Sequence, residues 1–189
     1  MAIIHRTTMS PTKLELLASW LPAQPWYEAT GSAPEPVKAG GFRLDDPEGE
    51  VGIEFMVVTD ASAAYLVPLT YRAAPIEGVA DDALIGTSEH GVLGTRWIYD
   101  GVHDPVLAAQ LLALLRDEAV PQAQSLSDAP DPTVHRDGAE LAATATFSDL
   151  TVTRRLEPAA AVPAPAAAHV TATWRLPDGS EVRSLFVTA

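Results

Sequence analysis

The sequence of 189 residues contains no cysteine, which excludes disulfides, thiolate-bound zinc and cysteine nucleophiles. It is also poor in basic residues: 12 lysines and arginines stand against 25 aspartates and glutamates, giving a formal net charge of −13. A surface this negative repels phosphate backbones and anionic membranes, so neither nucleic acid nor membrane is expected as a partner. The sequence has no apolar run long enough to span a membrane, and its first residues lack the apolar centre of a signal peptide. We therefore expect a cytoplasmic protein.

The motifs of common enzymes are missing as well. There is no G-x-x-x-x-G-K-[ST] phosphate loop and no H-E-x-x-H zinc motif. His135-Arg136-Asp137 matches the start of a kinase catalytic loop, but Ala142 stands where that loop needs an asparagine to hold magnesium. Four acidic residues crowd the turn at residues 45–50, but their spacing matches no calcium-binding loop. We predict no catalytic residue, no bound metal and no cofactor.

The most regular stretch of the sequence covers residues 83–115. It predicts a strand, a turn at Glu89-His90-Gly91, a second strand over residues 92–99, and then a helix. Asp104 is of the residue type that caps helices, and Pro105 suits the first helical position because its missing N–H would have no partner there. The residues that recur at helical spacing and predict one broad apolar face are Leu107, Leu111, Leu114 and Leu115.

Strands and turns dominate the rest of the sequence. A second helix is predicted to begin at Ser10-Pro11, which repeats the pattern of a cap followed by proline. Further strands are predicted over residues 2–8, 42–45, 51–58, 65–71, 141–147, 150–156, 170–175 and 181–187. Pro68 cannot donate a hydrogen bond to a neighbouring strand, so strand 65–71 is predicted to be an edge or bulged strand. The pattern as a whole predicts an α+β fold: a largely antiparallel sheet packed by two main helices, followed by a smaller all-β C-terminal part.

One segment carries a resemblance to a known family. Residues 16–27, LLASWLPAQPWY, resemble the L-x-x-W-L-P-x-Q-R-W-[FY] opening of actinobacterial-type maltokinases and related aminoglycoside-phosphotransferase-like sugar kinases. Residues 100–115 resemble the helix that closes the N-terminal cap of the same family. In that family the cap precedes the kinase and has a helix laid on a curved antiparallel sheet of cystatin-like character. The resemblance implies a stand-alone cap-like protein whose cap-like α+β subdomain covers residues 1–120.

The C-terminal part resembles this family in a different way. Residues 150–158, LTVTRRLEP, resemble the first strand of the kinase small lobe, with Thr151 at the position of the nucleotide-binding lysine. The family continues with a helix whose glutamate pairs with that lysine, whereas this chain has an Ala/Pro-rich loop, EPAAAVPAPAAA, over residues 157–168. The resemblance implies a β-rich subdomain over residues 121–189 that lacks the ion pair needed to grip a nucleotide.

The residues that could bind a ligand or partner are aromatic, acidic or basic. Tryptophan and tyrosine side chains could form a platform for a sugar ring, although aromatic residues at helical and strand spacing more often belong to a core. Glu89 and His90 supply a carboxylate and an imidazole, although both residue types also suit a turn. The candidate ligand- or partner-binding residues are Trp20, Trp26, Tyr27, Glu54, Glu89, His90, Arg96 and Trp97.

Two functions remain open from the sequence. The first, which the resemblance favours, is a non-catalytic cap-like module that binds or regulates a sugar kinase or another enzyme of α-glucan or trehalose metabolism. The second is a small carbohydrate-binding or weakly hydrolytic protein that uses the tryptophan, glutamate and histidine side chains. A protein partner is expected under the first function, and a homodimer is a further alternative.

Overall fold

The computed structural model describes residues 9–61, 63–125, 129–158 and 167–189. The strand predicted over residues 2–8 lies outside these described residues, as do residues 159–166 of the Ala/Pro-rich loop. The described helices are α1 (Lys13–Trp20) and α2 (Pro105–Leu115), with short 3₁₀ turns at Leu21–Ala23, Asp81–Ala83, Gly101–His103 and Phe147–Asp149. The described strands are β1 (Met9–Ser10), β2 (Val37–Leu44), β3 (Gly52–Asp60), β4 (Ala63–Arg72), β5 (Leu84–His90), β6 (Gly94–Asp100), β7 (Gln122–Ala123), β8 (His135–Asp137), β9 (Thr151–Val152), β10 (Arg155–Leu156), β11 (His169–Arg175) and β12 (Glu181–Thr188).

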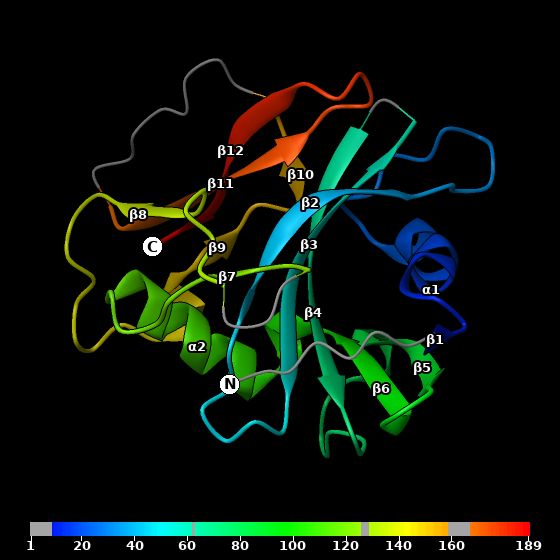
Figure 1. Ribbon diagram of the computed structural model, residues 1–189, viewed down its shortest axis with the longest axis horizontal. Helices are drawn as coiled ribbons and strands as arrows, with labels where there is room; N and C mark the ends of the chain where they lie inside the picture. The colour runs from blue at the N-terminus through cyan, green and yellow to red at the C-terminus, as the bar shows by residue number, and fades with distance from the viewer. Residues whose placement is uncertain (1–8, 62, 126–128, 159–166) are drawn as a thin grey trace.

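All of these strands join one antiparallel sheet. Its main path runs β1-β5-β6-β4-β3-β2-β11-β12-β9, while β10 pairs with β4, β7 with β2 and β8 with β11. Figure 1 shows α1 and α2 on opposite sides of the central strands β3 and β4. The predicted α+β fold with a largely antiparallel sheet and two main helices is confirmed.

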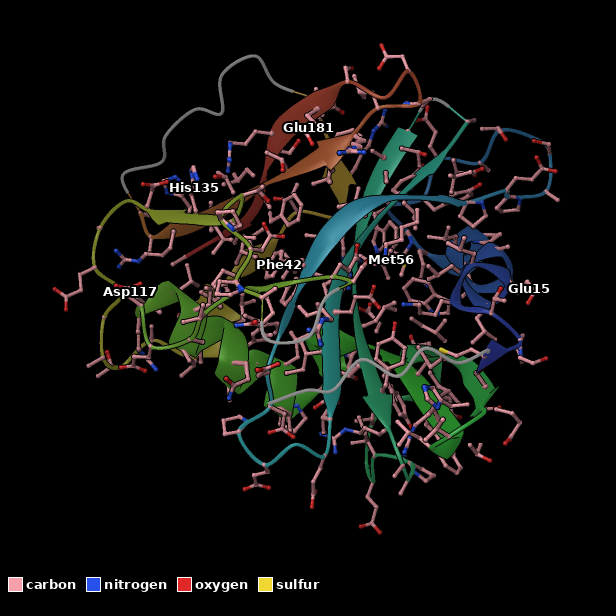
Figure 2. The ribbon with its side chains drawn as sticks, viewed as in Figure 1. Glu15, Phe42, Met56, Asp117, His135 and Glu181 are labelled. Carbon is pink, nitrogen blue, oxygen red and sulfur yellow. The ribbon has the colours of Figure 1, made fainter. Side chains whose placement is uncertain are left out.

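Alternation along β3 gives the sheet two buried faces. Ile53 and Phe55 belong to the core under α2, whereas Met56 and Val58 belong to the core under α1. Successive strand residues point to opposite faces, so one apolar strand can serve both cores. Figure 2 shows Phe42 on the α2 side of the sheet and Met56 on the α1 side. Below, the side of the sheet that carries the core under α2 is called the α2 face, and the side that carries the core under α1 is called the α1 face.

Helix α2 begins as predicted. Asp104 is its N-cap and accepts a hydrogen bond from the Val106 backbone N–H at 2.9 Å, and Pro105 is the first helical residue. The four leucines predicted to form its apolar face are all buried. Arg72 at the end of β4 donates from Nε and Nη2 to the two Asp104 carboxylate oxygens, each at 2.6 Å. The cap therefore also joins the start of α2 to β4.

Helix α1 begins two residues later than predicted. Its N-cap is Thr12, whose hydroxyl accepts from the Glu15 backbone N–H, while the Glu15 carboxylate accepts from the Thr12 backbone N–H. This reciprocal pair is a capping box. Ser10 instead lies in β1 and pairs with Glu89 of β5. The predicted start at Ser10-Pro11 was therefore wrong because Ser10 belongs to the sheet.

The prediction that Pro68 marks an edge or bulged strand was wrong, because β4 lies inside the sheet. One side of β4 pairs with β3 along its whole length, and the other side pairs with β10 at its start and with β6 at its end. The Leu66 backbone N–H donates to the Arg154 carbonyl on this second side. Backbone groups alternate along a strand, so the Pro68 nitrogen faces the same side, in the gap between β10 and β6. A missing N–H is tolerated in that gap.

Two further predictions of turns and strands were wrong. The β5–β6 hairpin turns at residues 91–93, since Glu89 and His90 are in β5 and pair with β6. Residues 141–147 contain no strand, and only two short strands, β9 and β10, lie within residues 150–156. The apolar pattern of the first segment reflects loop packing, because Leu141 contributes to the core under α2 without entering the sheet.

The C-terminal strands continue the sheet of the N-terminal part. The hairpin β11–β12 forms as predicted, with Gly179 donating to the Leu176 carbonyl in its turn. β11 meets β2 at Trp174 and Gly40, and β10 pairs with β4. The core under α2 contains side chains from both sides of residue 120. The subdomain boundary at that residue stays a prediction.

Candidate functional site

Glu54 is a buried carboxylate at the centre of the α1 face. Its side chain lies on β3 with 4% of the residue exposed. The Lys13 ammonium forms an ion pair with Oε2 at 2.7 Å, and the Tyr71 hydroxyl donates to the same oxygen at 2.5 Å. The Gln124 amide nitrogen donates to Oε1 at 2.7 Å. The Glu54 cluster, defined as these four residues, joins α1, β3, β4 and the segment after β7.

The cluster fixes the protonation of its members. Burial alone would raise the pKa of Glu54, but the charge and hydrogen bond of Lys13 and the hydrogen bond from Tyr71 hold that pKa below its ordinary value. Burial and the neighbouring Glu54 charge raise the pKa of Tyr71 well above its ordinary value. At neutral pH Glu54 is ionised and Tyr71 keeps its proton. Both carboxylate oxygens already accept hydrogen bonds, an arrangement typical of a structural ion pair.

The predicted aromatic residues of the first helix and its exit lie together on the α1 face. The rings of Trp20 and Trp26 are 5.7 Å apart, and Trp26 and Tyr27 lie 5.7 and 5.4 Å from the ring of Tyr65. The Tyr27 hydroxyl donates to Asp60 at 2.5 Å. Burial and this hydrogen bond raise the pKa of Tyr27 to about 12. These contacts hold the exit of α1 against the β3–β4 hairpin.

A second buried ion pair borders the aromatic residues. The Arg154 guanidinium lies 5.2 Å from the centroid of the Trp26 ring, in a cation–π contact. Its Nη2 atom donates to Asp100 Oδ2 at 2.5 Å, and Asp100 is 3% exposed. This pair connects the segment before β10 with the end of β6.

Glu89 and His90 act within their own hairpin. The Thr95 hydroxyl donates to Glu89 Oε1 across β5 and β6 at 2.6 Å. The backbone N–H groups of Val92 and Leu93 donate to His90 Nδ1 at 3.3 and 3.1 Å. Both side chains therefore stabilise the hairpin and its turn.

Arg96 and Trp97 follow on β6 and point to opposite faces. Arg96 pairs in register with Ser88, and Trp97 pairs with Thr87 and with Arg72. Ile98 belongs to the core under α1, so the alternation of the strand places its neighbour Trp97 on the other face. Trp97 is thus separated by the sheet from Trp20 and Trp26.

The acidic turn at residues 45–50 is organised by its own backbone. Asp46 is 5% exposed and accepts hydrogen bonds from the N–H groups of Glu48, Glu50 and Val51. Over the described ranges of the chain, no three His, Asp or Glu side chains gather closely enough to hold a metal ion. Neither α1 nor α2, nor any other helix in the described part, has the length and apolarity to cross a membrane.

The structure thus separates the eight predicted site residues into groups. Trp20, Trp26 and Tyr27 share one cluster, and Glu54 lies elsewhere on the same face. The four that lie on the β5–β6 hairpin are Glu89, His90, Arg96 and Trp97. Sequence reasoning missed the partners that complete the buried charges, because they are distant along the chain. These missed residues are Lys13, Tyr71, Arg72, Gln124 and Arg154.

The fold and these buried clusters define an α+β domain in which helices cover both faces of an antiparallel sheet. Residues 20–104 match the family model of the maltokinase N-terminal cap domain. The match extends from the last residue of α1 to the N-cap of α2 and contains β2 to β6. Over these residues the chain is similar to a maltokinase cap domain, as the resemblance in the sequence predicted. The match is to a cap domain and includes no catalytic kinase domain.

Proposed function

We propose that the protein is a non-catalytic cap module that binds a maltokinase-like sugar kinase, or another enzyme of α-glucan or trehalose metabolism, in the cytoplasm. The observation that carries this proposal is the match of residues 20–104 to the maltokinase N-terminal cap domain. A domain that in its family is attached to a sugar kinase is expected to recognise such an enzyme or one of related function.

The segment that resembles a kinase small-lobe strand supports the proposal. Thr151 occupies the position of the nucleotide-binding lysine and lies in β9, paired with Thr188 of β12. Arg155, four residues later, lies in β10 and pairs with Tyr65 of β4. The segment therefore completes the sheet of the cap at two places, which is a structural role that needs no nucleotide.

The tip of the β5–β6 hairpin is the surface we assign to the partner. Val92 is 62% exposed and Leu93 is 43% exposed, and Arg96 follows them on β6. Hydrogen bonds to His90 hold the backbone of this tip. An ordered apolar tip flanked by a cation suits the centre of a protein interface, where arginine and apolar residues contribute most.

The test is isothermal titration calorimetry, in which the purified chain is titrated into a maltokinase whose own cap has been removed. We expect a complex of fixed stoichiometry, weakened about tenfold or more by V92D, because a charge would be buried in the interface. V120D is the matched control, since Val120 is 58% exposed but lies after α2, outside the matched residues. Equal binding by V92D and wild type would contradict the assigned surface, and absence of any complex with maltokinase and with the related glucan enzymes would contradict the proposed function.

A further inference from the structure

A polar groove of about 590 Å³ opens where β2 and β11 separate. Its sides are the start of β2 and the end of β11 with the following turn, and its end is formed by Gln124, Asp131 and Thr133. It shares none of its lining residues with the eight predicted from the sequence. Figure 2 shows Glu181, which also lines the groove, at the start of β12.

Two glycines of β2 create the groove. Within the described residues, β2 meets β11 at a single pair, Gly40 with Trp174, and the register of β2 against β3 shifts just before it. A Cβ atom at Gly40 would lie 3.0 Å from the Trp174 Cβ. At Gly41, where φ is +123°, a Cβ atom would lie 2.0 Å from the Phe55 carbonyl oxygen and 3.0 Å from Gln124 Nε2. Glycine is required at both positions, and the bulge turns β2 away from β11 on either side of the contact.

The walls of the groove are held in place by internal hydrogen bonds. Asp131 Oδ1 accepts from the backbone N–H and the hydroxyl of Thr133. Arg183 of β12 donates to the Thr133 carbonyl and to the Thr171 hydroxyl. Gln124 is fixed by its hydrogen bond to the buried Glu54. The groove is therefore formed before any ligand arrives, which lowers the entropic cost of binding.

Lys38 presents an exposed ammonium on one side of the groove. This ammonium makes no hydrogen bond or ion pair with the described part of the chain. All of its N–H groups are therefore available to donate to the oxygens of a ligand.

The chemistry of the lining selects the class of ligand. Lys38 and Arg175 present donors, Asp131 and Glu181 present acceptors, and the threonine hydroxyls can act as either. The two carboxylates would repel a phosphate dianion, although Glu181 is already paired with Arg175 at 3.2 Å. Sugar hydroxyls both donate and accept, so they match a lining of mixed character.

A second, smaller hollow of about 180 Å³ reaches Arg155 and Glu157. The residues that line both hollows are Thr59, Trp174, Leu176 and Pro177. The volume of the larger groove is within the ordinary size of a small-ligand site, roughly 300–1,000 Å³.

We infer that the groove between β2 and β11 binds a neutral oligosaccharide. Lys38 on β2 and Glu181 on β12 contact its hydroxyls, and Gln124 and Asp131 contact them at the end of the groove. The inference rests on the groove alone and is independent of the cap function, because it needs no partner protein.

Titration of the full chain with maltotriose and with cellotriose, followed by amide NMR spectroscopy, tests the inference. We expect saturable shifts at the amides of Gly40, Gly41 and Thr133 with at least one of the two sugars. K38A should weaken this binding about tenfold, because a hydrogen bond to a charged group is lost. Lys38 makes no bond within the described residues, so the variant is expected to melt at the wild-type temperature.

R116A is the matched control, since it removes one positive charge at the end of α2, outside the groove, and should leave the affinity unchanged. Equal affinity of K38A and wild type would overturn the inference. So would shifts confined to Trp20 and Trp26, stronger binding of inorganic phosphate than of either sugar, or no shift with either sugar at millimolar concentration.

Discussion

The two faces of the central sheet differ in what their helices bury. On the α2 face, four leucines pack on mainly apolar strand residues, and the ion pair of Asp104 with Arg72 lies at the start of the helix. On the α1 face, three carboxylates, Glu54, Asp60 and Asp100, are buried among aromatic and aliphatic side chains. The α2 face is specified by residues close together in the chain, whereas the α1 face depends on partners brought together only by the fold.

The largest effect is expected on the α1 face, from E54A. This change leaves the Tyr71 and Gln124 donors without their acceptor and removes the partner of Lys13. Breaking a buried ion pair costs about 3–5 kcal/mol, and we expect about 3 kcal/mol because Lys13 is partly exposed. Urea unfolding followed by tryptophan fluorescence measures the change.

E54Q is the control, since it keeps the shape and one acceptor and should lose less stability than E54A. A loss below about 1 kcal/mol for E54A, the size of one ordinary hydrogen bond, would show that the Glu54 cluster contributes little to the α1 face.

A smaller effect is expected at the start of α2, from D104A. The change removes the N-cap bond to Val106 and leaves Arg72, which is partly exposed, without its carboxylate. We expect a loss of about 2 kcal/mol, the upper end of measured losses for helix caps. D104N separates the two contributions, because asparagine can cap the helix but cannot form the ion pair. Equal losses for D104A and D104N would assign the effect to the ion pair alone.

The dependence of stability on pH tests the charge of Glu54 on the α1 face. The pKa of Glu54 is lowered in the folded state, so its contribution is present above the ordinary carboxylate value of 4.5 and is lost as the pH falls through the folded value. The difference in unfolding free energy between wild type and E54Q should therefore narrow as the pH falls below about 4.5. Urea unfolding at several pH values measures it, and a difference that stays constant down to pH about 2 would contradict the ionised state of Glu54.

The smallest effect is expected at the start of α1. T12A removes the hydroxyl that accepts from the Glu15 N–H and should cost about 1 kcal/mol. S10A should change the stability by less, because the Ser10 side chain caps no helix. Thermal unfolding of both variants measures the difference, and a larger loss for S10A would contradict the start of the helix at Thr12.

Predictions from the sequence were accurate where the determining residues are adjacent. Asp104-Pro105 and the leucines that follow are sufficient to start α2 and orient its apolar face. The strand predicted over residues 51–58 forms as β3, and its alternation places Ile53 and Phe55 on the face opposite to Met56 and Val58. In both cases the helical or strand period carries the information, and no distant contact is needed.

Predictions failed where pairing between distant segments decides the outcome. Pro68 is tolerated inside the sheet because β10 and β6 leave a gap beside it, which only the strand order reveals. Ser10 resembles a cap but is taken up by β1. The Gly40-Gly41 pair was a readable signal of a bulge or close approach, yet the residues that complete the groove follow more than 80 positions later.

The candidate site shows the same division. The clustering of Trp20, Trp26 and Tyr27 follows from their proximity in the chain. Trp97 was predicted to belong to the same site. Whether it does depends on which residues of β6 face α1, and the sequence alone does not specify this. The cation that pairs with Glu54 comes from a residue 41 positions earlier, and no local pattern identifies it.

Phosphoryl transfer from Mg–ATP to maltose, measured with the purified chain alone and with a maltokinase present, tests the central claim most directly. A non-catalytic cap module should yield maltose phosphate only when the kinase is present. Formation of maltose phosphate by the chain alone, at a rate that scales with its concentration, would contradict the claim.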